Sequence, residues 1–150
     1  MKYSALNPSG LRQTMDRFPL SPRLPSLDGK VVYCVEIFAR PDFMKEVARR
    51  LPEYAPGVKA VFKAQAGGFE KFFDVNEIAQ NADAMIGGTV MGGGTGMYGA
   101  YWAMDVEKRG IPSVYVVGDM YTDGIRAAAA RRGMPDLRTA VIPLVEENLT

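Results

Sequence analysis

Hydrophobic and polar positions change their spacing in regular blocks along most of this chain. Compact runs of β-branched and aromatic residues, which are typical of buried strands, occur at 31–38, 58–64, 84–90, 113–117 and 139–142. Segments with helical spacing lie between them, at 41–51, 74–80, 97–109 and 122–132, and Asp74 is the expected N-cap of the second. Such alternation predicts parallel strands joined by right-handed crossovers. We therefore expect an open, mainly parallel, three-layer α/β sandwich of flavodoxin-like or Rossmann-like type.

The first 29 residues do not follow this pattern. They hold four of the ten prolines, Pro8, Pro19, Pro22 and Pro25, and show no sustained periodicity. This composition predicts an extended N-terminal arm (1–29), followed by a single α/β domain (30–150). Arms of this kind often pack on a neighbouring subunit, so we expect a homo- or hetero-oligomer.

Composition limits the chemistry. The 18 basic and 17 acidic residues leave a net charge of +1, which gives no reason to expect nucleic acid as a partner. No run approaches the roughly 20 apolar residues of a membrane span, and the opening MKYSALNPSG lacks an apolar signal core, so we expect a cytoplasmic protein. The single Cys34 excludes an internal disulfide. Because there is no His, proton transfer would fall to Asp, Glu, Tyr, Lys or the substrate, and no metal site is predicted.

A glycine-rich segment, MIGGTVMGGGTGMYGAYWAMDVEKRG, runs from 85 to 110, where a strand is expected to end and a helix to begin. It is not a nucleotide-phosphate loop, because no lysine follows before Lys108. Gly92, Gly94 and Met97 have the spacing of a dinucleotide fingerprint, but the last position is not glycine and the strand would be the third. We therefore assign no cofactor. Two readings remain open: free backbone amides that hold a carboxylate, phosphate or oxyanion, or glycines that only permit a tight turn and close packing.

Ligands of open parallel sheets bind beyond the carboxyl ends of the strands, where strand order reverses. The residues expected there divide into two groups. The candidate catalytic residues are Glu36, Tyr98 and Asp119, and the candidate substrate-binding residues are Arg40, Thr89, Gly92, Gly93, Gly94, Thr95, Gly96, Tyr101 and Trp102.

Each candidate side chain has a structural alternative. Glu36 interrupts an apolar strand, so it either faces the cleft or is buried and paired; burial would raise its pKa and suit it to act as a base. Asp119 is either a second base or a helix cap, and Arg40 either clamps a carboxylate or is an ordinary exposed arginine. The aromatics at 98, 101 and 102 share one helix face. They form a core or subunit contact, or an apolar wall that offers a tyrosine hydroxyl.

Several stretches resemble a known family. Residues 82–112 with DVEKRGIPSVYVV, the later RRGMPDLRTAVIP and the opening NPSG are similar to the UGSC family of thiol- or selenol-bearing proteins, which is related to components of glycine, sarcosine and betaine reductases. The family's defining tetrapeptide, a selenocysteine or cysteine followed by Gly-Ser-Cys, aligns with Gly92, Gly93, Gly94 and Thr95. Both redox-active positions are therefore missing, and Cys34, within an apolar strand, is expected to be a core thiol.

Two hypotheses about function follow. The chain is a subunit of an oligomeric enzyme, of lyase, hydratase, isomerase or reductase type, that acts on a small carboxylate or carbonyl compound. Alternatively, it is a noncatalytic subunit that pairs with a thiol- or selenol-bearing relative through the arm and the aromatic helix face. An NTPase or a stand-alone thiol reductase is not expected.

Overall fold

The computed structural model describes residues 15–37, 41–64, 74–88 and 94–143. Its centre is a five-stranded sheet in the order β2-β1-β3-β4-β5, in which every neighbouring pair is parallel. The strands are β1 (Val31–Glu36), β2 (Lys59–Lys63), β3 (Ala84–Gly88), β4 (Ser113–Gly118) and β5 (Thr139–Ile142). This is the flavodoxin-like order, and it confirms the predicted α/β class.

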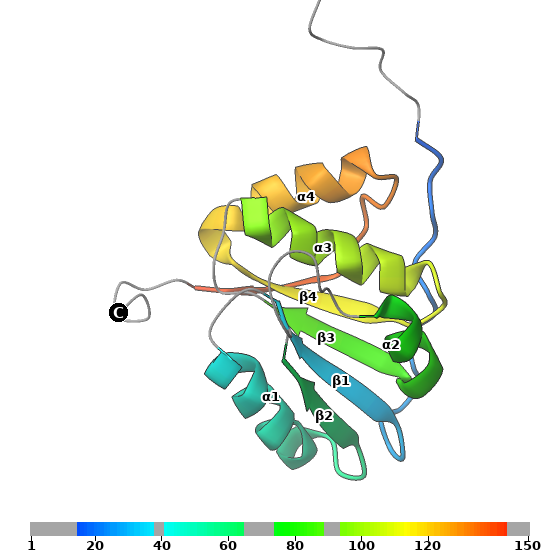
Figure 1. Ribbon diagram of the computed structural model, residues 1–150, viewed down its shortest axis with the longest axis vertical. Helices are drawn as coiled ribbons and strands as arrows, with labels where there is room; N and C mark the ends of the chain where they lie inside the picture. Colours follow the sequence, from blue (N-terminus) through cyan, green and yellow to red (C-terminus); the bar gives the residue numbers. More distant parts are fainter. Residues whose placement is uncertain (1–14, 38–40, 65–73, 89–93, 144–150) are drawn as a thin grey trace, which may run out of the picture.

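Helices cover the sheet unequally on its two faces (Figure 1). They are α1 (Pro41–Tyr54), α2 (Val75–Asn81), α3 (Gly94–Glu107) and α4 (Thr122–Arg131), with a short 3-10 turn, η1 (Asp119–Tyr121), before α4. On one face, α1 buries Met44 against Val32 and Cys34 of β1. On the other face, α2, α3 and α4 share a larger core with β1, β3 and β4. The three predicted layers are therefore present.

Most predicted elements occur close to their predicted limits, and the differences have local causes. The Asp74 carboxylate accepts the N–H of Asn76 at 2.8 Å, which confirms the predicted N-cap. The first helix continues through Pro52 to Tyr54 instead of ending at residue 51. A proline in the last turn removes only one hydrogen bond there, so the amphipathic packing of α1 outweighs this loss.

The described part of the N-terminal arm, residues 15–29, has no regular secondary structure. The Phe18 N–H donates to the carbonyl of Gly133 at 2.8 Å, and the Lys108 ammonium lies 4.2 Å from the centre of the Phe18 ring. This part of the arm therefore packs on its own domain. Residues 1–14 lie outside the described residues, so the docking of that segment on a neighbour stays a prediction.

A buried ion pair fixes the arm to the domain. The Glu107 side chain is completely buried; it accepts hydrogen bonds from the N–H groups of Ser21 and Ser113 at 2.6 and 2.7 Å and pairs with Arg138 at 2.7 Å. Arg138 also donates to the Ser21 carbonyl at 2.8 Å. Glu107 belongs to the segment EKRGIP and Arg138 to the segment GMPDLR. Two of the segments that resemble the family are therefore in contact through this ion pair, and their role there is structural.

Candidate functional site

The carboxyl ends of β1 and β3 lie side by side at the point where strand order reverses. Glu36 pairs in register with Gly88, and the next N–H, of Ile37, donates to the Gly88 carbonyl at 2.9 Å. After β1 the chain continues to α1 on one face, whereas after β3 it continues to α3 on the opposite face (Figure 1). Divergence of this kind marks the position at which open α/β sheets bind ligands.

Glu36 is half-buried at this edge. Desolvation by burial raises the pKa of its carboxyl group, and the nearby negative charge of Asp42 in α1 raises it further. A carboxyl group in this state holds its proton at higher pH than an exposed glutamate and is a stronger base once ionised. Glu36 therefore lies at the end of its strand, partly buried, in an environment that favours the neutral form of its carboxyl group.

The predicted anion cradle is described only at its end. Arg40, Thr89, Gly92 and Gly93 lie outside the described residues, and for Gly94 and Thr95 the helical backbone is described. From Gly94 onward the chain is helical, so α3 begins within the glycine run, earlier than the predicted start at residue 97. Its first turn lies at the same edge as the ends of β1 and β3 (Figure 1). Free N–H groups and the positive end of the helix dipole favour an anion at such a position.

Two glycines of the same run serve packing instead of ligand approach. A Cβ atom on Gly88 would lie 2.8 Å from the Met44 sulfur and 3.1 Å from Cβ of Val116. A Cβ atom on Gly99 would lie 2.6 Å from the Tyr115 hydroxyl oxygen. The first glycine allows α1 to approach β3, and the second allows α3 to approach β4. For Gly88 and Gly99 the geometry therefore supports the interpretation that the glycine permits close packing.

Tyr115 supports the start of α3, a role that sequence reasoning missed because the residue lies inside an apolar strand. It is fully buried, and its hydroxyl donates to the Gly96 carbonyl at 3.0 Å. Burial raises the pKa of this hydroxyl, which therefore stays protonated as a donor. The available sign in the sequence was Gly99, whose missing side chain leaves room for a ring on that helix face.

The three aromatic residues of α3 are not equivalent. Tyr98 is 48% exposed, whereas Tyr101 and Trp102 are partly buried against the core. The rings of Tyr98 and Tyr101 meet edge to face at 6.2 Å, and the Arg132 guanidinium stacks 3.6 Å above the Tyr101 ring. Tyr101 therefore mediates contact between α3 and the end of α4, and Tyr98 is the most exposed of the three.

Asp119 follows the carboxyl end of β4, next to β3 in the sheet. Its carboxylate accepts the N–H of Met120 at 2.7 Å within η1. Gly118 is the N-cap of η1, whereas Tyr121 occupies the N-cap position of α4 and makes no side-chain cap bond, so the Gly118-Asp119 pair begins the short turn and not α4 itself. Asp119 thus lies on the same sheet edge as Glu36, one strand beyond β3.

Cys34 is a core thiol. Its side chain is fully buried in the cluster beneath α1, and burial raises its pKa to about 11. A thiol with this pKa is almost entirely protonated near neutral pH and is a poor nucleophile.

Within the described residues, no three His, Cys, Asp or Glu side chains are grouped so as to hold a metal ion. None of the described helices combines the length and apolar character needed to cross a bilayer.

The strand order and the polar groups at its reversal point define the class: a flavodoxin-like α/β protein with a candidate ligand site at the carboxyl edge of its sheet. The chain belongs to the UGSC family, whose model matches residues 4–148. That match includes the segments EKRGIP and GMPDLR as well as residues 92–95. Neither the curated proteins nor the solved structures contain a match to this chain.

Proposed function

We propose that this chain is a subunit of an oligomeric enzyme that acts on a small carboxylate or carbonyl compound. The observation that carries the proposal is the position of Glu36. This carboxyl group, whose pKa is raised, lies at the end of β1 beside β3, and β3 leads into the glycine run at the start of α3. A proton acceptor and an anion-binding helix start thus share one sheet edge.

This arrangement suits proton transfer at a carbon next to a carbonyl group. Glu36 accepts the proton, and the electron pair of the broken C–H bond moves toward the carbonyl carbon to give an enolate oxyanion. Backbone amides of residues 92–96 stabilise that oxyanion or hold a substrate carboxylate. The hydroxyl of Tyr98 or the carboxyl of Asp119 supplies the second acid–base group. Lyases, hydratases and isomerases of small acids share this step.

Thiol chemistry by this chain alone is disfavoured. The family resemblance aligns the redox tetrapeptide with Gly92, Gly93, Gly94 and Thr95, none of which has a thiol. Cys34 cannot substitute, because it is buried with a pKa of about 11. Any reductase activity would need a nucleophile from a partner subunit.

One observation favours the second candidate function, a noncatalytic subunit that pairs with a thiol- or selenol-bearing relative. Large apolar side chains are exposed in the elements next to the candidate site: Met97 by 39%, Tyr98 by 48% and Met120 by 68%. A partner that covered them could complete the site with its own thiol. Native mass spectrometry of the protein purified from its own cells separates the two candidates, because only the second requires a stable complex with a different chain.

The catalytic proposal is tested by hydrogen–deuterium exchange into small 2-oxo acids and short carboxylates, followed by NMR in D₂O with the natively purified oligomer. We expect exchange in at least one compound, and a loss of about 100-fold or more in Glu36→Gln, as for removal of a general base. Glu53→Gln, an exposed position on α1, is the matched control. Absence of exchange across the panel, or exchange that persists in Glu36→Gln, would reject Glu36 as the base.

A further inference from the structure

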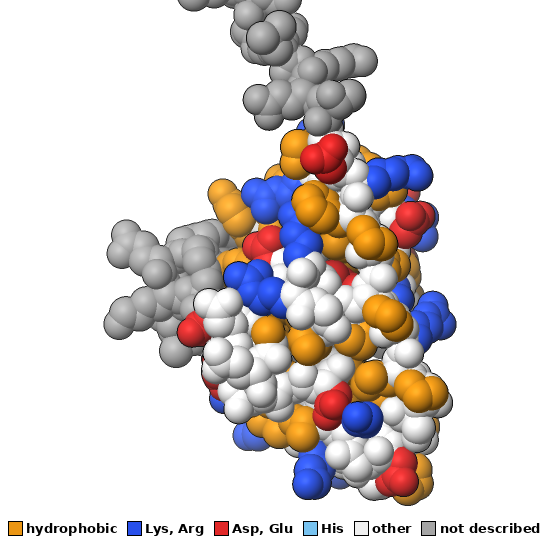
Figure 2. Space-filling model, turned by 90° about the vertical axis from the view of Figure 1, so that its right-hand side faces the viewer, with side chains coloured by type: hydrophobic (Ala, Val, Ile, Leu, Met, Phe, Trp, Pro, Cys, Tyr) orange, Lys and Arg blue, Asp and Glu red, His pale blue; other side chains and the backbone are white. Residues whose placement is uncertain are grey.

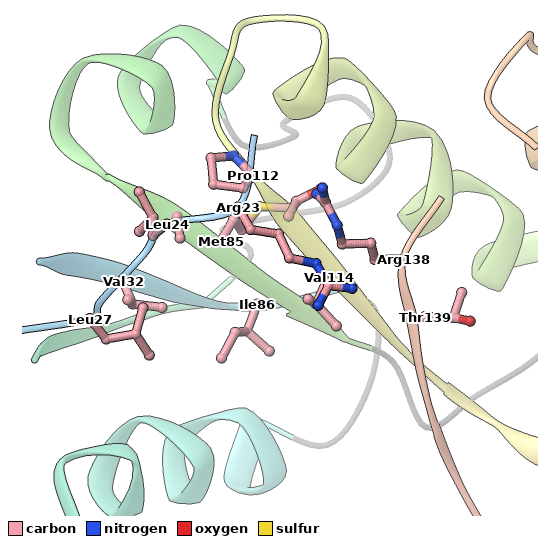
Figure 3. A pocket seen from close by; sticks show the side chains of 12 residues that line it. Arg23, Leu24, Leu27, Val32, Met85, Ile86, Pro112, Val114, Arg138 and Thr139 are labelled. Carbon is pink, nitrogen blue, oxygen red and sulfur yellow. The ribbon is translucent and has the colours of Figure 1, made fainter. Parts of the chain in front are cut away.

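A concave region of the sheet surface lies at the end opposite the candidate site. On the face that carries α1, this helix packs mainly on β1 and β2 and reaches β3 at Gly88, and no described helix covers β4 and β5. A pocket of about 450 Å³ lies there (Figure 3). It is lined by Arg23, Leu24, Leu27, Val32, Ala84, Met85, Ile86, Pro112, Ser113, Val114, Arg138 and Thr139. Because Ala84, Ser113 and Thr139 are the first residues of their strands, the pocket is separate from the carboxyl-edge site.

The surface of the pocket is mainly apolar. Ile86 and Val114 are register neighbours on β3 and β4 and form its floor, and Val32 of β1 extends that floor. Leu24 and Leu27 of the arm contribute a side wall (Figure 3). A volume of several hundred Å³ with apolar walls and a few polar groups is typical of small-molecule sites.

Two arginines line this apolar surface, and they differ in charge compensation. Arg138 is neutralised by the buried Glu107 at 2.7 Å and also donates to the Ser21 carbonyl. Arg23 is exposed, and among the described residues it has no ion pair or side-chain hydrogen bond. Its side chain reaches across the strands toward Val114 (Figure 3). No acidic residue of the described part of the chain lines the pocket, so no described carboxylate compensates the charge of Arg23 there.

The surface on this side of the molecule is mixed in character. On the side of the molecule where the strands begin, hydrophobic side chains lie among both basic and acidic side chains (Figure 2). An apolar floor beside a guanidinium that has no ion pair among the described residues complements a ligand with an apolar body and one negative group.

We propose that this pocket binds a small amphiphilic carboxylate, whose hydrocarbon part lies on Ile86 and Val114 and whose carboxylate pairs with Arg23. The arm supplies both the apolar wall and the charged group, so the ligand also ties the arm to the sheet. The site is independent of the proposed enzymatic function, since none of the described residues of the carboxyl-edge site lines it.

The test compares octanoate with octanamide, which has the same chain length without the charge, by titration of the full chain and amide chemical shifts in NMR. We expect octanoate to shift the signals of Val32, Ile86 and Val114 and to bind about tenfold more tightly than octanamide, as one charge-assisted hydrogen bond provides. Arg23→Gln should abolish this preference. Arg17→Gln, an exposed arginine on the same arm, should preserve it.

Val114→Phe should weaken both compounds by filling the floor of the pocket. Equal affinity for octanoate and octanamide, or an unchanged preference in Arg23→Gln, would overturn the proposal. Shifts confined to residues outside the pocket would also overturn it. If octanoate bound only after removal of residues 144–150, the occupant would be the chain's own C-terminal segment and the ligand proposal would be wrong.

Discussion

Replacement of Glu107 by glutamine tests whether the buried ion pair fixes the arm and the domain together. The carboxylate accepts two backbone N–H groups, from Ser21 and Ser113, as well as Nη1 of Arg138. A glutamine has one acceptor oxygen, and its NH₂ group would face a backbone donor. At least one buried N–H group therefore loses its partner, and Arg138 loses its compensating charge.

The size of the effect follows from burial. The Glu107 side chain is completely buried, and that of Arg138 is only 17% exposed. Removal of one member of a buried pair typically costs 3–5 kcal/mol, so we expect Glu107→Gln to lower the free energy of unfolding by about 3 kcal/mol. For a chain of this size that corresponds to a fall in Tm of roughly 6–12 °C.

The assay is urea denaturation followed by circular dichroism, with Glu107→Gln, Arg138→Met and the double variant. Because the two residues contact each other, the double variant should cost about 2 kcal/mol less than the sum of the single variants. Amide hydrogen exchange should show lost protection at Phe18 and Ser21, where the arm meets the domain. Glu46→Gln is the matched control, because its pair with Arg49 at 2.7 Å is exposed and should contribute no measurable stability.

Two results would refute this reasoning. A loss below about 1 kcal/mol in Glu107→Gln would mean that water or a rearranged arm satisfies the donors of the cluster. An additive double variant would mean that the ion pair has no coupling energy of its own. If Glu107→Gln failed to fold, Arg138→Lys, which retains the positive charge but not the planar fork, would still report on the pair.

Three further predictions concern packing, charge and the thiol. Gly99→Ala should destabilise the protein by about 1–3 kcal/mol, because the added Cβ atom would clash with the Tyr115 ring. In the control Gly124→Ala, in α4, the added Cβ atom meets no atom within 4 Å, so stability should be unchanged or rise by up to about 1 kcal/mol. Thermal melts compare the two variants. Because the folded-state pKa of Glu36 is raised, the wild type should lose stability as pH rises above the usual glutamate value, and Glu36→Gln should become relatively more stable between pH 4 and 7; a constant difference in Tm over that range would contradict this. Cys34 should resist a water-soluble thiol reagent at pH 8 until urea unfolds the protein, and rapid labelling of the native chain would show that it is not a core thiol.

Local patterns predicted the elements well because their causes are local. The run VVYCVE is apolar on both faces, as a central parallel strand requires, and Asp74 caps its helix through a hydrogen bond to a residue two positions away. The predicted first and last residues of helices were less accurate where tertiary packing determines them. The helix α3 begins at Gly94, ahead of the first clearly periodic residue, and α1 continues past Pro52.

The candidate site was predicted in part. Edge-of-strand reasoning placed Glu36 and Asp119 at one edge of the sheet, and the structure has them there, at the end of β1 and directly after β4, because parallel strands bring all their carboxyl ends to the same side. The sequence could not distinguish glycines that allow a ligand to approach from glycines that allow two elements to pack closely. That distinction depends on which atoms lie opposite each missing Cβ atom. Gly99 faces the ring of Tyr115, sixteen positions away in the chain, and only the folded protein brings the two together.

The sequence by itself determined the fold class, the strand–helix alternation and the family. Hydrophobic periodicity, helix caps and the sequence motifs typical of the family are all properties of short stretches of chain. Only the tertiary structure decided that Glu107 and Arg138 pair across 31 positions and hold Ser21 of the arm, and that the β3–β5 face opposite α3 and α4 has a pocket. The physical reason is the same for both. Ion pairing and surface coverage depend on distances between residues remote in sequence, and those distances exist only after the sheet has assembled.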